Sequence, residues 1–179
     1  GIPNYRLPKE RLDDDIRAIL KTGVQVKNGL KIGQDITIQE LRQQYDVVLI
    51  TIGASTDKKL GLENEDADGI ISAVQFLRNV GKNQIIDLTG KEVAVIGGGN
   101  VSMDAVRTAK RLGAKKVSIV YRRREADMTA LPGEIEGAVA EGIELQTLKA
   151  PASIDVDENH HVKGIYVTPQ MVSSIRDGR

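Results

Sequence analysis

The sequence of 179 residues contains no cysteine and no tryptophan, and aromatic residues make up only 3% of it. Without cysteine the chain forms no disulfide, no thiolate metal site and no redox-active cysteine pair. The scarcity of aromatic side chains disfavours a nucleic-acid surface on which bases stack. No apolar run approaches the roughly 20 residues that span a bilayer, and no signal peptide is visible. We therefore expect a cytoplasmic protein with no membrane and no nucleic-acid partner.

The charge of the chain is balanced, with 25 lysine and arginine residues against 25 aspartate and glutamate residues. A neutral chain has no global field that would attract nucleic acid or an acidic membrane. The two histidines, His160 and His161, are adjacent in a predicted turn. Adjacent side chains of an extended chain point to opposite faces, so we expect no shared metal ion and no metal site.

The most informative stretch is residues 93–124, which read VAVIGGGNVSMDAVRTAKRLGAKKVSIVYRRR. A short apolar strand runs into three glycines, a helical pattern follows and ends at Gly113, and a second apolar strand ends at Tyr121. Strand, glycine turn, helix and strand form the mononucleotide-binding unit. In that unit Gly97 makes the tight turn, Gly99 lets the backbone approach a diphosphate, and small Ser102 lets the helix pack on the strand. A purely structural glycine turn is the alternative.

The end of the second strand indicates which dinucleotide binds. An NAD site commonly has an acidic residue there, which hydrogen-bonds the adenosine ribose. This strand instead ends in Arg122, Arg123 and Arg124. Guanidinium groups suit a doubly charged 2′-phosphate, so the position favours NADPH over NADH. A solvated basic turn is the alternative interpretation.

The remaining pattern predicts an α/β fold: a Rossmann-like, doubly wound, mostly parallel sheet with a small antiparallel segment near the C-terminus. Gly1 opens the chain without a methionine, and Asp177-Gly178 near its end is typical of a turn, so we expect part of a longer protein. Helices are expected at 8–22, 37–44, 70–80 and 133–141, strands at 24–27, 47–52 and 144–148, a linker at 54–68, a loop at 126–132, and a hairpin of 153–156 with 162–168.

Several motifs together resemble the NADPH-binding domain of the glutamate synthase small (beta) subunit family, a group of flavin-dependent pyridine nucleotide oxidoreductases. They are the segment from Gly97 to Asp104, Ala109-x-Arg111-Leu112-Gly113-Ala114, Tyr121-Arg122-Arg123, Gly1-Ile2-Pro3-Asn4-x-x-Leu7, Tyr45-Asp46-Val47-Val48-x-x-x-Ile52-Gly53-Ala54, Glu134-Ile135 and Ala140-Glu141-Gly142. The likeness covers nearly the whole chain. It departs at Thr129, where the family commonly has proline, so the shape of that loop is expected to differ.

The resemblance implies that NADPH reduces FAD and that electrons then pass to an iron–sulfur or partner acceptor, such as a large catalytic subunit. It implies cofactor contacts from Gly97, Gly98, Gly99, Asn100, Val101, Ser102, Arg122, Arg123, Arg124 and Glu134. It also implies that residues 1–59 are a partial segment adjoining or belonging to a missing FAD domain of the same polypeptide, and that 60–179 form the NADP(H)-binding domain. No second glycine fingerprint and no cysteine is present, so the FAD diphosphate site and any iron–sulfur clusters would lie elsewhere in the full-length protein.

Alternatives stay open for individual residues and for the function. Asn100 could cap the helix instead of, or as well as, meeting the diphosphate. Arg124 could face solvent, and Glu134 could be a first-turn acid favoured by the helix dipole. We expect no catalytic acid, base or nucleophile in this chain, because the cofactors carry the hydride chemistry. The alternative function is a non-catalytic dinucleotide-sensing domain.

Overall fold

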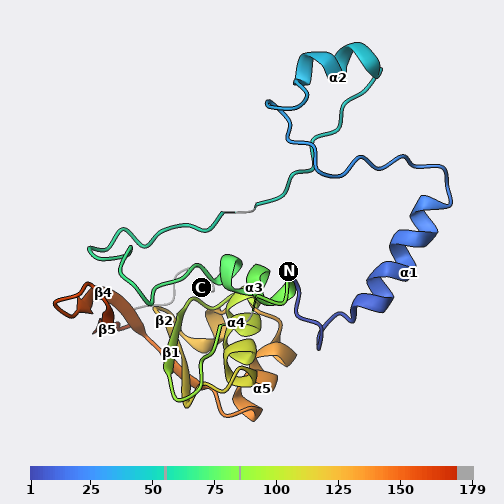
Figure 1. The fold of residues 1–179 in the computed structure, drawn as a ribbon. Coiled ribbons are helices and arrows are strands. Elements are labelled where there is room, and N and C mark those ends of the chain that lie inside the picture. The colour runs from blue at the N-terminus through green and yellow to red at the C-terminus, as the bar shows by residue number, and fades with distance from the viewer. Residues whose placement is uncertain (55, 85, 173–179) are drawn as a thin grey trace. The chain divides into compact units, whose positions relative to one another are not determined.

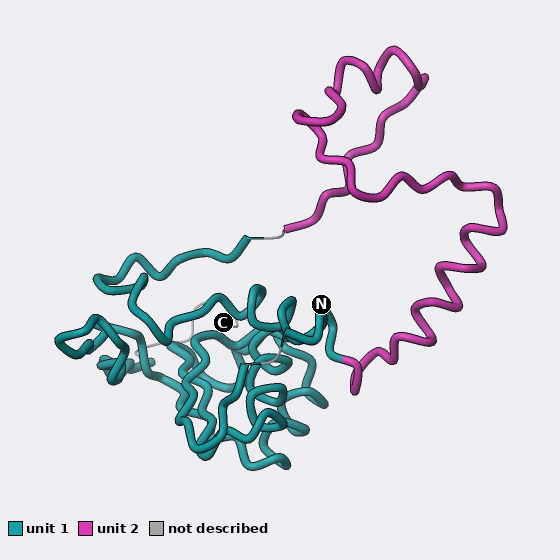
Figure 2. The backbone as a smooth tube through the Cα atoms, in the orientation of Figure 1, with its two compact units in different colours: residues 1–3, 56–179 teal, residues 4–55 magenta. Residues whose placement is uncertain are grey.

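The computed structural model describes residues 1–54, 56–84 and 86–172. The turn predicted at Asp177-Gly178 lies outside the described residues. The chain divides into two compact units, residues 4–55 and residues 1–3 with 56–179, which Figure 2 colours separately. No helix of the described residues is both long and apolar enough to cross a membrane.

The larger unit is built around a parallel sheet of three strands in the order β1-β2-β3. Figure 1 labels the first two of these strands. The strands are β1 (Glu92–Ile96), β2 (Lys116–Tyr121) and β3 (Glu144–Thr147). Ala94 pairs with Ser118, and Ser118 pairs in turn with Glu144. In the central strand β2, residues 117–120 are at most 8% exposed, as expected for a strand that is covered on both faces.

Helices cover this sheet and complete the hydrophobic core. They are α3 (Ala73–Gly81), α4 (Asn100–Arg111) and α5 (Pro132–Ala140), and α4 contacts β1, β2, α3 and α5. On α4, Met103, Val106 and Ala109 are at most 1% exposed and pack into the core with Ile119. Gly113 follows the C-cap residue Leu112, and its φ of +88° confirms the predicted left-handed conformation after the helix.

A two-stranded antiparallel sheet of β4 (Lys149–Val156) and β5 (Val162–Pro169) follows. The hairpin is confirmed, although each strand is longer than predicted. The predicted α/β class, with a parallel sheet and a small antiparallel segment near the C-terminus, is also confirmed. A short 3-10 helix, η1 (Glu125–Asp127), occupies the start of the expected loop at 126–132.

Part of the segment expected to be a linker packs against the hairpin instead. Ala67 is only 2% exposed, the amide of Asp68 donates to the carbonyl of His160 (3.0 Å), and the amide of Val162 donates to the carbonyl of Asp68 (2.8 Å). The linker prediction was wrong for this stretch. Polar composition suggested solvation, but backbone pairing with a distant strand fixes the segment.

The smaller unit contains two helices, α1 (Lys9–Leu20) and α2 (Ile38–Gln44), as predicted. A reciprocal capping box begins α2, because Thr37 Oγ1 accepts from the amide of Glu40 (3.1 Å) and Glu40 Oε2 accepts from the amide of Thr37 (2.8 Å).

The strands predicted at 24–27 and 47–52 are absent from this unit, where both segments lack regular structure. An apolar strand needs neighbouring strands to satisfy its backbone and cover its side chains, and no described strand lies alongside. As a result Val47, Leu49 and Ile52 are 81%, 83% and 86% exposed.

Candidate nucleotide-binding site

The glycine turn connects β1 to α4 and begins at Gly97. This residue has a φ of +138°, and a Cβ added to it would lie 2.7 Å from Ser102 Oγ. Its amide donates to the carbonyl of Val120 (3.1 Å), so the turn starts directly from the sheet. Ser102 is 8% exposed and packs against the turn. The sterics agree with the predicted roles of Gly97 in the tight turn and of Ser102 as a small packing residue.

The middle glycine is closely packed. A Cβ on Gly98 would lie 2.8 and 2.9 Å from two ring carbons of Tyr121 and 3.0 Å from Met128 Cγ. The carbonyl of Gly98 accepts hydrogen bonds from the amides of Thr129 (3.0 Å) and Ala130 (3.1 Å). Gly98 therefore fastens the segment after η1 to the glycine turn.

The third glycine stands at the open start of α4. Gly99 is the N-cap residue with extended backbone, and a Cβ there would meet only Thr129 Oγ1, at an ordinary 3.5 Å. Asn100 and Val101 are the first helical residues, and N–H groups at such positions have no intrahelical acceptor. Their amides and the positive end of the helix dipole together can bind an anion.

The side chain of Asn100 has a partner that the sequence did not predict, while its contact with the diphosphate stays a prediction. Its Oδ1 accepts a hydrogen bond from the amide of Leu131 (3.0 Å). The predicted capping role was wrong, because Gly99 holds the N-cap position and no side chain caps the helix. Asn100 instead joins the start of α4 to the segment before α5. No local signal reveals this contact between residues 31 positions apart in the sequence.

The arginines follow β2 at the same, carboxyl edge of the sheet as the glycine turn. Arg122 and Arg123 are exposed, while the carbonyl of Arg123 accepts from the amide of Leu148 (3.0 Å). A shallow hollow surrounds them, lined by Arg122, Arg123, Arg124, Asp127, Leu148, Gln170, Met171 and Val172. The glycine turn and two accessible cations are thus presented by adjacent strands.

Arg124 does not extend freely into solvent. Its Nε and Nη2 donate to the two carboxylate oxygens of Asp127, at 2.9 and 2.7 Å. The hydrogen bond from Arg124 holds the pKa of the Asp127 carboxyl below its usual range. This bidentate pair engages the guanidinium that the sequence assigned to the cofactor.

Glu134 lies in the first turn of α5 and is bound to α4. Its Oε2 is 2.7 Å from Arg107 Nη1, and Arg107 Nε is 2.9 Å from Glu141 Oε1. Burial would raise the pKa of Glu141, but hydrogen bonds from Arg111 and Arg107 outweigh it and leave that pKa below its ordinary value. The contact supports a structural role for Glu134, and its cofactor role stays a prediction.

The histidines are exposed and lie beside separate carboxylates, His160 near Asp66 (3.5 Å) and His161 near Asp68 (3.6 Å). Among the described residues, no three His, Asp or Glu side chains gather in an arrangement that could hold a metal ion.

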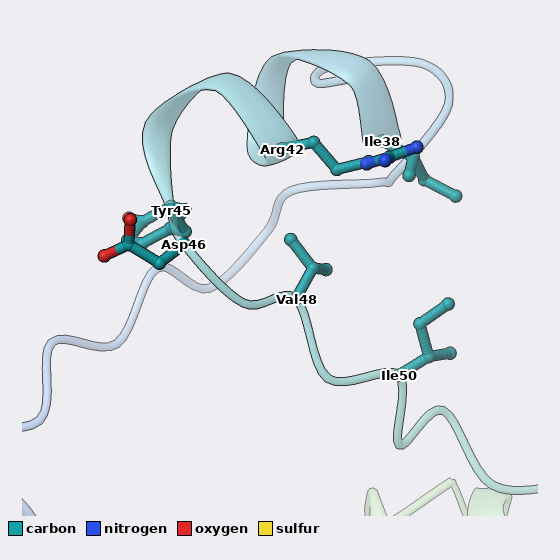
Figure 3. A pocket seen from close by; sticks show the side chains of 6 residues that line it. All are labelled: Ile38, Arg42, Tyr45, Asp46, Val48 and Ile50. Atoms are coloured by element: carbon teal, nitrogen blue, oxygen red, sulfur yellow. The ribbon is translucent and has the colours of Figure 1, made fainter.

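The smaller unit has an open hollow of its own. Figure 3 shows its lining side chains, which come from α2 and from the segment that follows it: Ile38, Arg42, Tyr45, Asp46, Val48 and Ile50. Three of the six are aliphatic, and we assign no chemistry to this hollow.

The sheet, the glycine turn and the open helix start are features of a Rossmann-like, nucleotide-binding class of α/β protein. Comparison with known families matches residues 5–173 to pyridine nucleotide-disulphide oxidoreductase. The chain therefore belongs to the pyridine nucleotide-disulphide oxidoreductase family.

Two curated relatives illustrate the likeness. The chain is 40% identical over 167 residues to the NADP(+)-dependent formate dehydrogenase subunit beta of Moorella thermoacetica, covering 92% of this chain and 24% of the relative. It is 35% identical over 175 residues to the glutamate synthase [NADPH] small chain of Escherichia coli K12, covering 92% and 37%. The chain thus spans about a quarter of the first protein and somewhat more than a third of the second. The resemblance to the glutamate synthase small-subunit group is confirmed.

A solved structure supports the fold. FprA from Mycobacterium tuberculosis in complex with NADPH superposes with a TM-score of 0.70 at 19% identity, covering 96% of this chain and 54% of that one. At this identity the likeness concerns the fold alone.

Proposed function

We propose that residues 60–179 bind NADPH and orient it for hydride transfer to FAD, within a longer oxidoreductase similar to the glutamate synthase small subunit. Residues 1–59 would adjoin or belong to the FAD domain of that polypeptide, whose diphosphate site is not in this chain. One observation supports this proposal above all. The open start of α4 after Gly97–Gly99 and the exposed Arg122 and Arg123 follow two adjacent strands, β1 and β2.

Each part of this site has a chemical role in the proposal. The amides of Asn100 and Val101 would hold the diphosphate, since N–H groups at a helix start suit an anion. Arg122 and Arg123 would contact the 2′-phosphate, where planar guanidinium groups bind oxygen atoms in pairs. The cofactors supply the hydride chemistry, while the protein binds and orients them.

The relatives' names support the choice of cofactor, because both carry NADP(+) or NADPH in them. Electrons would leave the flavin for an iron–sulfur centre, a large catalytic subunit or another acceptor. The chain alone is not expected to catalyse the reaction, because it lacks the flavin site.

Titration calorimetry of the chain with NADPH and NADH tests the binding proposal. We expect tighter binding of NADPH, and the double variant R122A/R123A should lose most of that preference, at about 1.5–3 kcal/mol for each charged contact. The matched control is K91A/K115A, which removes the same charge from residues that precede β1 and β2. Equal affinities of the unmutated chain for both nucleotides would defeat the proposal.

The full-length protein tests the enzymatic part. With the flavin domain present, NADPH should bleach the flavin absorbance under anaerobic conditions. Binding without reduction of FAD would instead identify a dinucleotide sensor.

A further inference from the structure

Asp127 accepts the hydrogen bonds that hold the turn after β2 in place. Its backbone carbonyl accepts a hydrogen bond from the hydroxyl of Tyr121 (2.8 Å). Its carboxylate accepts from Nε, Nη2 and the backbone amide of Arg124, at 2.9, 2.7 and 3.2 Å. The side chains of Arg124 and Asp127 are 34% and 23% exposed, so this pair is partly shielded from water. One residue thus closes the segment 121–127 on itself.

The backbone is held by hydrogen bonds on both sides of the two exposed arginines. The turn is fixed on one side by Asp127 and on the other by the hydrogen bond from the Leu148 amide to the Arg123 carbonyl (3.0 Å). Leu148 is itself held, because its carbonyl accepts from the amide of Gln170 (2.8 Å). The backbone that carries Arg122 and Arg123 is therefore anchored at both ends, although their side chains remain accessible.

Tyr121 also links this turn to the glycine turn. Its ring lies against Gly98, where an added Cβ would be 2.8 Å from Cε2, and its hydroxyl is bonded to Asp127. A single side chain therefore connects the glycine turn to the turn after β2.

We infer that Asp127, held by the Tyr121 hydroxyl and the Arg124 guanidinium, is a positioning residue for recognition of the 2′-phosphate. Arg124 then serves as an internal tie, and among the described residues that line the hollow, Arg122 and Arg123 are the two cations left for the ligand. The inference rests on the proposed function, since it needs an adenosine 2′-phosphate in this hollow. Its physical basis is pre-organisation: an anchored backbone loses less conformational freedom when its side chains bind.

The experiment compares two probes that differ only in the 2′-phosphate, 2′,5′-ADP and 5′-AMP, by calorimetric titration of the whole chain. The first variant is Tyr121→Phe, which removes one hydroxyl and no charge. The second is R124A/D127A, which removes the ion pair without changing the net charge. Tyr166→Phe is the matched control, because Tyr166 is 64% exposed on β5 and no described hydrogen bond joins it to this turn.

Y121F should lower the ratio of the two affinities by about three- to tenfold, the range of one net hydrogen bond, while leaving 5′-AMP binding unchanged. R124A/D127A should lower the ratio at least as much, because it removes all three hydrogen bonds between Arg124 and the carboxylate of Asp127. Y166F should behave as the unmutated chain.

Two results would overturn the inference. If R124A alone lowers the affinity ratio as much as R122A does, while Y121F leaves the ratio unchanged, Arg124 is itself a phosphate ligand. If Y121F lowers the melting temperature but leaves the ratio unchanged, the ties are only structural. An unmutated chain that binds both probes equally would instead defeat the proposed function, so the two failures are distinguishable.

Discussion

Alanine substitutions at Gly98 and Gly99 are expected to affect different properties of the protein, although the two residues are neighbours. Neither has a backbone that requires glycine: Gly98 is not among the positive-φ residues, and Gly99 has a φ of −100°. What differs is the space around each Cβ. Gly98→Ala should therefore impair folding, whereas Gly99→Ala should impair nucleotide binding.

The distances around Gly98 determine how much stability Gly98→Ala should cost. The new methyl carbon would lie 2.8–3.0 Å from carbons of Tyr121 and Met128, against the 3.5–4.0 Å of an ordinary carbon contact. The ring would have to retreat by about 0.7–1 Å, while its hydroxyl is bonded to Asp127. Overpacking of this kind costs about 1–3 kcal/mol, or a fall in melting temperature of about 3–10 °C.

Gly99→Ala meets only Thr129 Oγ1, at 3.5 Å, so the melting temperature should change by less than about 2 °C. If the diphosphate approaches this backbone as proposed, the methyl group should weaken NADPH binding at least about tenfold. Gly133→Ala on α5 is the control, because its Cβ meets nothing within 4 Å. It should leave binding intact and stability unchanged or slightly raised.

Thermal unfolding followed by circular dichroism and calorimetric titration with NADPH measure both effects on the same samples. Equal melting temperatures for G98A and G99A would refute the packing argument. Unaltered NADPH affinity in a folded G99A would refute the placement of the diphosphate.

Three further predictions concern charge, pH and helix ending. Glu141→Gln removes the carboxylate that joins Arg107 and Arg111, and should cost about 1 kcal/mol at pH 7. Because the folded-state pKa of Glu141 lies below its ordinary 4.5, this contribution is present above pH 4.5 and lost below it, so unfolding curves of the two chains should converge in acid. The preference for NADPH should fall as the pH drops through about 6, because a phosphate monoester loses its second charge there. Asp127 stays ionised over this range, since its pKa is lowered. A preference that stays constant from pH 7.5 to 5 in titrations would contradict this prediction. Gly113→Ala places a side chain at a φ of +88° and should lower stability by about 1–2 kcal/mol in thermal unfolding, with an unchanged melting temperature as the opposing result.

The strand–turn–helix–strand unit at residues 92–121 was predictable because its signals are local. The apolar strand before Gly97, the helical spacing after Gly99 and the stop at Gly113 each act within a few residues. The elements β1, α4 and β2 accordingly lie where the sequence placed them. The strand predicted at 47–52 failed for the opposite reason, since its apolar residues form a strand only beside partner strands, and none is described here.

The fine structure of the site was not predictable, because it depends on distant partners. Asn100 meets Leu131, and Glu134 meets Arg107 across two helices. The Arg124–Asp127 pair is closer in sequence, but a charge run followed by an acid is equally consistent with a solvated turn. The partners of such side chains depend on which distant residues the fold brings together. A single sequence does not show which residues become neighbours.

The carbonyl of Gly98 accepts hydrogen bonds from the amides of residues 129 and 130, which lie beyond the end of β2. The glycine turn therefore depends on a segment outside the strand–helix–strand unit that contains it. An excised piece covering residues 92–124 should contain the glycine fingerprint and all three arginines and yet bind poorly, because it lacks the two amides that hold the carbonyl of Gly98.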